Sequence, residues 1–476
     1  MAIICVIDGV ALCVLIWIAL RQGLEKALPF AAFVFVLTPR DASIPLPGLF
    51  DLTTQRLVLL TMVGLYCFLP SRGSSAGRIY RPLRWLIAVH IIWCLISTAN
   101  SVVPLMSIKK MVSESIEYYV LYYVFVRVVT NRGTINRILF AIVAAVIVCS
   151  ALGAVEAYNN WAVIDWFPRV THHFDGWSVQ VEFSGRGQRV ATTFAHPILF
   201  GAGLVMAIVL TLYLLKVTSG IGKKALLWGG LLLMFLNIYK TSSRGPWLGL
   251  ILSFAALFIW EKGRGRRYLT MIGILSMTVL LIRPGIWETL GNMYVGTLDP
   301  NSPLGSSYEY RYALRDLAVK TVSKSAERAL WGYGMESFYY LGLEADLNGK
   351  PYKFLSCDSA WVELMVETGY VGLLIVGAIL LVPPWFAWNS LRRSPHSGDR
   401  VQLYLMTIML AYYFMMLSAA MYGWGQTGYI LWMIIAASTV HNRLQIARAP
   451  GTKAKPMEIE DEAPLARLAP SLNCGG

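Results

Sequence analysis

Long apolar stretches recur along most of the chain, and they limit what it can fold into. The first runs from Ile3 to Leu20, and similar stretches return at short intervals as far as Val440. About 20 apolar residues are enough for a helix to cross the hydrocarbon core of a bilayer. Because lipid offers the backbone no hydrogen-bond partners, each stretch must satisfy its own amide groups, as a helix does. We therefore expect an all-α polytopic membrane protein.

The positions of these stretches predict about 12–13 transmembrane helices. The stretch at 27–38 is short, so we expect either a span or a re-entrant helix there. No small-residue cleavage site follows the first stretch, which we interpret as a retained span rather than a signal peptide. The predicted spans lie near residues 3–20, 27–38, 54–69, 83–99, 111–128, 136–155, 194–215, 225–240, 245–260, 268–282, 359–388, 402–422 and 426–440.

The composition agrees with a membrane protein. Of the 476 residues, 56% are hydrophobic and 14% are charged, whereas soluble domains carry roughly 25% charged residues. The net charge of +14 would suggest nucleic acid in a soluble protein. Here we assign it to basic cytoplasmic loops and expect no nucleic-acid partner. The cysteines show no metal-ligand or disulfide spacing, and nucleotide-binding and HExxH motifs are absent, so we expect no metal and no cofactor.

Basic residues gather in every second predicted loop, which sets the orientation. By the positive-inside rule these loops face the cytoplasm, together with a tail at 441–476. That tail is rich in Pro, Ala and charge, so we expect it to be disordered. The membrane domain, 1–440, then carries its two longest loops, 156–193 and 283–358, on the outer face. The basic residues of the cytoplasmic loops are Arg72, Arg78, Arg81, Arg84, Arg127, Arg132, Arg137, Lys216, Lys223, Lys224, Lys262, Arg264, Arg266, Arg267, Arg392, Arg393 and Arg400.

The two outer loops have the composition of folded segments rather than linkers. The loop at 156–193 is rich in aromatic residues and holds His172, His173 and Asp175. Such a surface suits sugar rings, and the alternative is an aromatic belt at the membrane interface. In the loop at 283–358, Ser306 to Glu309 resembles a capped helix start.

An amphipathic stretch at 309–328 follows that predicted helix start. Arg311 and Arg315 are four residues apart, so they are expected to share one helix face. The large outer loop is therefore predicted to be partly helical.

Several basic residues fall on the outer side, against the positive-inside rule. Lys240 and Arg244 flank a short turn, and Arg189 lies just before a span. Lys109 and Lys110 also fall on the outer side. A charge at the membrane surface usually marks a ligand or partner. Arginine grips phosphate oxygens through two N–H groups and stays charged at any relevant pH. Converging arginines would bind a diphosphate, and the alternative is that each reaches toward lipid headgroups.

Three outer segments share an order and spacing with a known family. The first reads Arg-Val-Ala-Thr-Thr-Phe-Ala-His-Pro from Arg189, and the second reads Thr-Ser-Ser-Arg-Gly from Thr241. The third runs from Arg311 through Trp331–Gly334 and Asp358 to Glu-Thr-Gly-Tyr-Val-Gly at 367–372. Over about residues 189–380 the chain resembles the O-antigen ligase and O-antigen polymerase superfamily of bacterial surface-polysaccharide enzymes. Ala191 and Ile198 stand where that family usually has Gly and Asn.

The resemblance implies a metal-independent glycosyltransferase of the GT-C kind in the bacterial inner membrane, with its site facing the periplasm. The implied donor is a glycan on undecaprenyl diphosphate. The acceptor is another lipid-linked repeat unit in a polymerase, or lipid A core in a ligase. Membrane lipid and other polysaccharide-assembly proteins are further candidate partners.

The family motifs also suggest roles for individual residues. Asp358, Arg244 and Arg311 are the predicted catalytic residues, with Asp358 as the base that deprotonates the attacking sugar hydroxyl. A helix cap is the alternative for Asp358. Ligases carry a histidine at this position and many polymerase-like relatives an aspartate, which favours a polymerase. The predicted substrate-binding residues are Arg189, Arg315, His196 and Glu367, of which Glu367 alternatively orients an arginine or only packs.

Two other protein classes remain open from the sequence. A transporter or flippase of lipid-linked sugars would also use arginines in a membrane cavity, but such proteins often carry inverted repeats, and no internal repeat is visible here. A non-catalytic scaffold would not need the outer arginines. A cavity open only to the outer face and the lipid would favour the enzyme.

Overall fold

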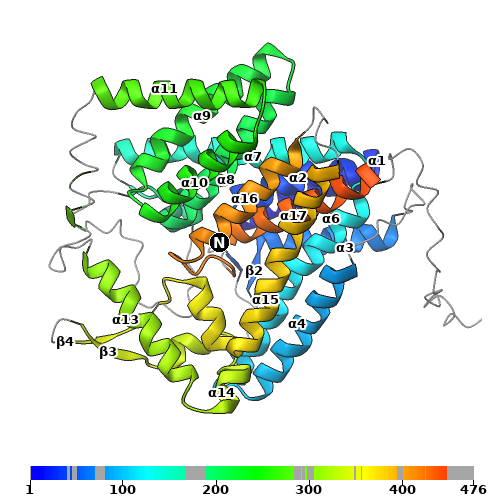
Figure 1. Cartoon of the computed structure of the whole chain (residues 1–476). Coiled ribbons are helices and arrows are strands. Elements are labelled where there is room, and N and C mark those ends of the chain that lie inside the picture. The colour runs from blue at the N-terminus through cyan, green and yellow to red at the C-terminus, as the bar shows by residue number, and fades with distance from the viewer. Residues whose placement is uncertain are drawn as a thin grey trace, which may run out of the picture.

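The computed structural model consists mainly of helices, with two short antiparallel hairpins (Figure 1). It describes residues 2–39, 43–44, 51–69, 81–159, 161–167, 189–282, 291, 295–296, 305–347, 350–354, 356–393, 400–423 and 425–446. The predicted aromatic surface with His172, His173 and Asp175 lies outside these residues, as does the predicted tail beyond Ile446.

The elements follow one another with short connections across most of the chain. The first half contains α1 (Ala2–Gln22), α2 (Leu24–Leu37), β1 (Ser43–Ile44), β2 (Leu52–Thr53), α3 (Thr54–Phe68), α4 (Arg81–Ala99), α5 (Pro104–Glu114), the π-helical turn η1 (Ser115–Val120), α6 (Leu121–Val128), α7 (Arg132–Asn159), η2 (Val163–Trp166), η3 (Thr192–Phe194), α8 (Pro197–Val217) and α9 (Ile221–Lys240). The second half contains α10 (Arg244–Trp260), α11 (Arg264–Ile282), α13 (Gly305–Val322), α14 (Ala326–Trp331), η4 (Ser337–Tyr340), β3 (Glu344–Leu347), β4 (Lys350–Lys353), α15 (Ala360–Arg393), α16 (Val401–Met415) and α17 (Gly425–Ile446).

Six of the described helices are long and apolar enough to cross a membrane: α1, α4, α7, α8, α9 and α15. Three shorter apolar helices, α3, α10 and α16, accompany them. The prediction of an all-α polytopic membrane protein is therefore confirmed. The other predicted spans coincide with α2, α5 to α6, α11 and α17, and the exact number of crossings stays a prediction.

Helix ends that are distant in sequence meet on one side of the bundle, which we call the site face. The side chain of Gln426, at the start of α17, donates to Thr38 O at 3.0 Å and Thr193 O at 2.7 Å. Gln55, at the start of α3, donates to the same Thr38 carbonyl. These bonds join the end of α2 and the segment before α8 to the starts of two other helices.

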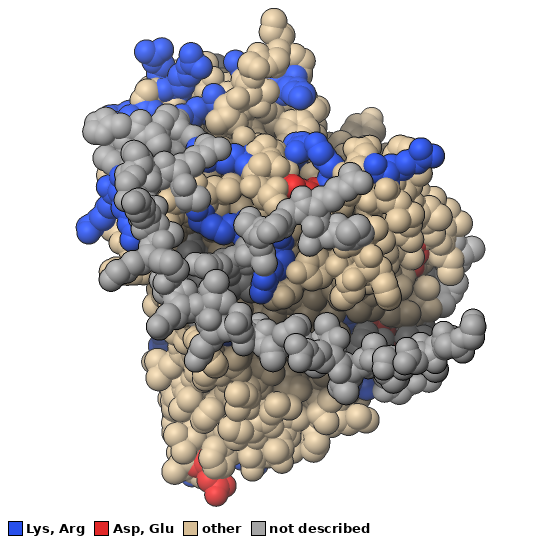
Figure 2. Space-filling view, turned by 90° about the vertical axis from the view of Figure 1, so that its right-hand side faces the viewer, with Lys and Arg blue, Asp and Glu red and all other residues tan. Residues whose placement is uncertain are grey.

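The opposite ends meet on a second side, which we call the basic face. Glu25, at the start of α2, accepts hydrogen bonds from Thr130 and Asn131 in the connection between α6 and α7. Among the described residues, Lys216 pairs with Glu261 at 2.9 Å, and Arg137 and Lys223 line one pocket with Lys26, so the basic connections from α6 to α7, α8 to α9 and α10 to α11 belong to this face. Lys and Arg gather over the upper part of the side of the molecule that Figure 2 shows, which is the right-hand side of Figure 1. The sorting of charge agrees with the alternation predicted from the sequence.

The core is centred on α8, in which 94% of the residues in the most apolar stretch are buried. It packs against α7, α9, α10, α16 and α17. A side chain at Gly201 would come within 2.6 Å of Pro246, so this glycine lets α8 approach the start of α10 closely. The start of α10, where Arg244 lies, is thereby held against the central helix.

A second, smaller core lies on the site face, and it is formed by the segment that follows α11 in the sequence together with the first turns of α15. Leu314 and Ala318 of α13 pack with Phe338, Phe354 and Val366. Figure 1 shows α13, α14 and the β3–β4 hairpin grouped beside the lower part of α15. The amphipathic stretch predicted to run over 309–328 is shorter, because α13 ends at Val322 and α14 begins separately at Ala326.

Candidate active site

The turn before α10 carries the first of the predicted catalytic arginines. Ser242 adopts a left-handed backbone conformation, with φ of 47°, and Arg244 is the first residue of α10. A side chain at Gly245 would come within 2.2 Å of Ser418 Oγ, in the connection between α16 and α17. The turn is therefore packed closely against the connection between α16 and α17, which fixes the position of the Arg244 backbone on the site face.

Arg189 binds this same turn. Its Nε donates to Thr241 O at 2.9 Å and its Nη2 donates to Ser243 Oγ at 2.7 Å. A backbone hydrogen bond joins the same two segments, since Val190 N donates to Lys240 O. Arg189 thus joins the segment before α8 to the end of α9 and the start of α10. The geometry gives Arg189 a positioning role in addition to the substrate contact predicted from the sequence.

The segment from Ala191 to His196 is held in an unusual backbone conformation. Thr192 and Ala195 have φ of 52° and 61°, in a region that non-glycine residues rarely occupy and that concentrates at functional sites. The buried Glu156 carboxylate accepts from Thr192 N at 2.9 Å and from Ala191 N at 3.3 Å. Ala191 itself has φ of −130°, so its conformation does not require the glycine that is usual in the family.

His196 caps the N-terminus of α8. Its Nδ1 accepts from Ile198 N at 3.2 Å, so the neutral ring carries its proton on Nε2. Burial, together with the positive charges of Arg189 and Arg311, lowers the pKa of His196 to about 4. The ring is therefore neutral at physiological pH and can act as a hydrogen-bond donor through Nε2.

Arg311 and Asp358 form an ion pair across the outer segment. Arg311 Nη2 lies 3.1 Å from Asp358 Oδ2, and the two side chains are 29% and 34% exposed, so a substrate can reach them. Burial raises the pKa of Asp358 above its ordinary value, while Arg311 and Arg189 act in the opposite direction. Since Arg189 and Arg311 influence both Asp358 and His196, the four residues share one electrostatic neighbourhood.

The alternative role of Asp358 as a helix cap fits the geometry less well. Glu363 N donates to Ser359 O at 3.0 Å, so the carbonyl of Ser359 accepts the first hydrogen bond of α15. That acceptor defines the cap position, and Asp358 lies one residue earlier. The geometry favours a carboxylate held by Arg311.

Arg315 does not join this group. It lies one turn further along α13 than Arg311, is exposed, and stacks its guanidinium on Tyr312 at 5.4 Å from the ring centroid. A shared helix face is therefore insufficient, because the part of that face that carries Arg315 is turned to solvent. Its predicted contact with substrate stays a prediction.

Glu367 belongs to a separate buried cluster around Lys110. Lys110 Nζ lies 3.0 Å from Glu367 Oε1, 2.9 Å from Glu363 Oε1 and 3.4 Å from Glu336 Oε2. Lys110 comes from α5, and the glutamates come from α15 and the residue before η4. The described geometry favours the alternative in which Glu367 orients a basic side chain, although that side chain is a lysine rather than an arginine.

The helix that follows Asp358 is interrupted just after Glu367. Gly369 has φ of 70° and ψ of −176° inside α15. The carbonyl freed at Glu367 accepts from Gly334 N at 2.9 Å and Ser97 Oγ at 2.8 Å, and Trp93 Nε1 donates to Thr368 O. Every polar backbone group must be satisfied inside a bilayer, so these bonds make the interruption possible.

The interruption also requires its glycine. A side chain at Gly369 would lie 2.1 Å from Leu330 O, and one at Gly332 would lie 2.6 Å from the backbone of Glu367. The segment Trp331–Gly334 and the residues from Glu367, which belong to the same family-like series in the sequence, are therefore in direct backbone contact. Together they fix the first turns of α15 behind Asp358.

Sequence reasoning did not identify the partners of these residues. Glu156 and Glu336 belong to no motif, and the sequence distinguishes Lys110 only as a basic residue on the outer side. That misplaced charge was the one signal that could have led to the cluster. Within the described ranges, no three His, Cys, Asp or Glu side chains are grouped to hold a metal ion. The predicted absence of a metal stays a prediction.

Comparison with known proteins agrees with the predicted resemblance. A family model described as "O-Antigen ligase" matches residues 229–377. The matched segment includes Arg244, Arg311, Asp358 and Glu367, whereas Arg189 and His196 lie before it. A search among curated proteins finds no match to the chain.

Proposed function

We propose that the chain is a polymerase-type glycosyltransferase of the O-antigen ligase and polymerase superfamily, which the family-model match at residues 229–377 supports. It transfers a glycan from undecaprenyl diphosphate to a hydroxyl of another lipid-linked repeat unit. The observation that carries the proposal is the Asp358 carboxylate, which pairs with Arg311 at 3.1 Å in the neighbourhood of Arg189 and His196.

The chemistry needs a base and a stabilised leaving group. The acceptor hydroxyl oxygen forms a bond to the anomeric carbon of the donor, and the bond from that carbon to the diphosphate oxygen breaks. The hydroxyl proton passes to the Asp358 carboxylate, and the electron pair of the broken bond stays on the diphosphate. Fixed donors that face the developing negative charge lower the barrier most in a site shielded from water.

The predicted residues other than Arg315 each receive a role in this scheme. Arg244 and Arg311 bind the diphosphate oxygens, and the neutral His196 donates a further hydrogen bond from Nε2. Arg189 positions Arg244 by holding Thr241 O and Ser243 Oγ. Arg311 therefore lies between base and leaving group, where it contacts both.

The Lys110 cluster has an indirect, structural role in the same scheme. It anchors the first turns of α15 through Glu363 and Glu367, and so it supports the position of Asp358 without contacting the substrate. We regard Glu367 as a positioning residue.

A polymerase is favoured over a ligase by the residue at position 358. The resemblance associates a histidine with ligases and an aspartate with many polymerase-like relatives. The test is incubation of the purified protein with lipid-linked repeat units, in the presence and absence of lipid A core. A ladder of glycan lengths without lipid A core supports the polymerase. Transfer that occurs only to lipid A core contradicts it and indicates a ligase.

The proposed orientation follows from the charges on the two faces. The basic face lies in the cytoplasm of a bacterial inner membrane, and the site face lies in the periplasm. Cysteines introduced at the exposed Arg315 and at the exposed Lys262 should be labelled from opposite sides by a reagent that does not cross the membrane. Labelling of position 315 from the cytoplasm alone would contradict the orientation.

A further inference from the structure

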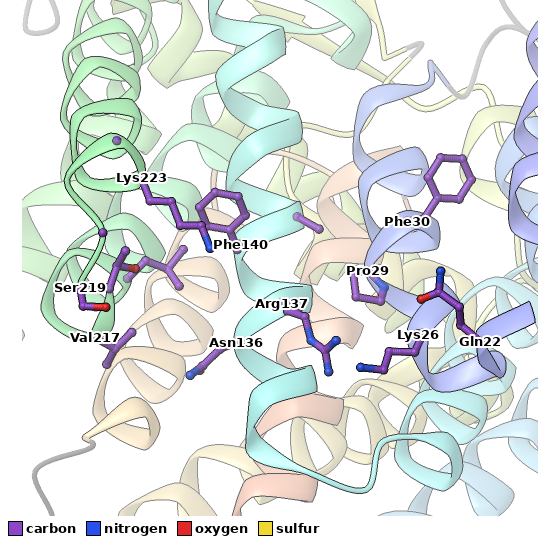
Figure 3. A pocket seen from close by; sticks show the side chains of 15 residues that line it. Gln22, Lys26, Pro29, Phe30, Asn136, Arg137, Phe140, Val217, Ser219 and Lys223 are labelled. Carbon is purple, nitrogen blue, oxygen red and sulfur yellow. The ribbon is translucent and has the colours of Figure 1, made fainter. Parts of the chain in front are cut away.

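A large pocket opens on the basic face, at the other ends of the helices that form the candidate active site. Its volume is about 1010 Å³, and it lies between the start of α2, the start of α7 and the connection from α8 to α9. Figure 3 shows the three elements around it. None of the residues discussed for glycosyl transfer lines this pocket, so it needs an explanation of its own.

Three cations from three different helices line the pocket: Lys26, Arg137 and Lys223. All three side chains are exposed, and in Figure 3 those of Lys26 and Arg137 point toward one another. Arg137 bonds within its own helix, to Gly133 O and Thr134 Oγ1. In the described part of the chain, none of the three cations forms an ion pair with a carboxylate.

The acidic residue nearest in sequence is already occupied. Glu25 precedes Lys26, but its two carboxylate oxygens accept from Thr130 and Asn131. The pocket therefore concentrates positive charge that an anion would neutralise. Like charges that converge without an acid are unfavourable at short range, which makes a bound anion the natural complement.

The walls of the pocket combine two kinds of surface. Pro29, Phe30, Phe140 and Leu214 form apolar parts of it, and Thr218 and Ser219 add polar groups beside Lys223. Phosphate oxygens accept from hydroxyl, ammonium and guanidinium donors alike. Acyl chains would instead lie against the aromatic and aliphatic walls, since burying apolar surface is favourable.

We propose that this pocket binds the phosphate headgroup of an anionic glycerophospholipid from the surrounding membrane. The phosphate lies among Lys26, Arg137 and Lys223, and the upper part of the acyl chains lies along Phe30 and Phe140. Basic pockets between membrane helices on the cytoplasmic side are suited to such headgroups. The lipid joins α2, α7 and α9 at the basic face.

The test compares lipid binding by matched variants of the full-length protein in detergent, with phosphatidylglycerol as the anionic probe and phosphatidylcholine as the zwitterionic one. Native mass spectrometry gives the fraction of protein bound at each lipid concentration. Each basic residue near a membrane surface contributes about 1 kcal/mol toward anionic lipid, so the combined variant K26Q/R137Q/K223Q should lose affinity for phosphatidylglycerol on the order of 100-fold.

The matched control removes three charges from the same face, outside the pocket. Lys262 in the connection from α10 to α11 is exposed, as are Arg264 and Arg267 in the first turn of α11. The variant K262Q/R264Q/R267Q should bind phosphatidylglycerol nearly as well as the unaltered protein. An equal loss in both combined variants would mean that overall charge alone attracts the lipid, and it would overturn the site.

A second pair of variants tests the pocket without changing charge. Gly222 lines the pocket and Gly229 lies two turns further along α9, and a side chain at either position meets no atom within 4 Å. Gly222→Trp should fill the pocket and weaken phosphatidylglycerol binding, and Gly229→Trp should not. Equal binding by the two variants would contradict the proposal.

The source of the phosphate is distinguished by competition. Inorganic phosphate lacks acyl chains, so it should displace phosphatidylglycerol only at a large molar excess. Displacement at equal concentration would indicate a site for free phosphate and would overturn the assignment to a lipid. Equal affinity for phosphatidylcholine would overturn it as well, because that headgroup carries no net charge.

Discussion

Arg311 and Asp358 are 47 residues apart in the chain, yet Nη2 of the first lies 3.1 Å from Oδ2 of the second. The pair joins α13 to the residue just before Ser359 and α15. It also places a guanidinium, which can bind phosphate oxygens, beside a carboxylate, which can accept a proton, and the proposed glycosyl transfer from a diphosphate needs both.

Substitutions of Asp358 can distinguish a catalytic base from a residue with only a structural role. Asp358→Asn keeps the size and can still accept from Arg311, but it cannot take a proton from the acceptor, so activity should be lost as completely as in Asp358→Ala. Both variants should be present in the membrane at normal amounts. Glycan length in cells and protein abundance on a blot measure the two properties. An Asp358→Asn variant that makes glycans of normal length would rule out Asp358 as the base.

Replacement of Asp358 by histidine restores the residue associated with ligases. If the site needs only a base at this position, Asp358→His should retain part of the activity that Asp358→Asn loses. A rate for Asp358→His no higher than that of Asp358→Asn would mean that the site specifically requires a carboxylate.

Arg244 and Arg315 should differ in their effects on activity. Arg244→Ala should reduce the rate by about 10²- to 10³-fold, as expected for loss of one donor to a developing negative charge. Arg244→Lys should recover little, because an ammonium group lacks the two-pronged geometry of guanidinium. Arg315→Ala is the comparison, since Arg315 is another arginine on the site face. Its loss of activity should be much smaller because Arg315 is exposed and stacks on Tyr312. Equal rates for Arg244→Ala and the unaltered protein would contradict the proposed role.

The rate should fall at low pH as Asp358 becomes protonated. Burial raises the pKa of Asp358, so the decline should begin above the pH expected for an ordinary aspartate. Arg311 lowers that pKa, and its removal should therefore move the decline to higher pH. The pH dependence of the residual rate of Arg311→Gln measures this shift, with Arg311→Lys as the control that keeps the charge. A shift to lower pH in Arg311→Gln would contradict the pairing. His196, with a pKa of about 4, should cause no change between about pH 5 and pH 8.

Gly369 should be essential for the position of α15. Gly369→Ala brings a methyl group against Leu330 O at a φ of 70°, so both thermal stability and activity should fall. Gly377 lies in the same helix with no atom within 4 Å of an added side chain, and Gly377→Ala should be nearly neutral. Thermal unfolding in detergent compares the two variants. Equal midpoints would show that the contact between α14 and α15 contributes little.

The sequence predicted the class of fold because its main signal is local. An apolar stretch near membrane length determines a helix by itself, as it does for α7 and α8. The interruption of α15 is different, since Gly369 looks like any glycine in an apolar helix. Its conformation depends on Leu330 and Gly334, which are distant in sequence and become neighbours only in the folded chain.

The same distinction applies to the candidate site. The resemblance indicated Arg244, Arg311 and Asp358 together, and the pairing of the last two agrees with that grouping. Helical spacing predicted that Arg315 would accompany Arg311, but spacing cannot tell which part of a face is covered. The Lys110 cluster depends on contacts across more than 200 residues, such as the separation of 253 between Lys110 and Glu363, and no local pattern encodes these.

The most direct test of the central claim is to count undecaprenyl diphosphate released against glycosidic bonds formed. Purified protein in liposomes is given lipid-linked repeat units, and both products are quantified over time. The proposed reaction predicts one undecaprenyl diphosphate for each new bond, with both products absent in Asp358→Asn. Movement of intact lipid-linked units across the bilayer without release of undecaprenyl diphosphate would contradict the enzyme and indicate a transporter.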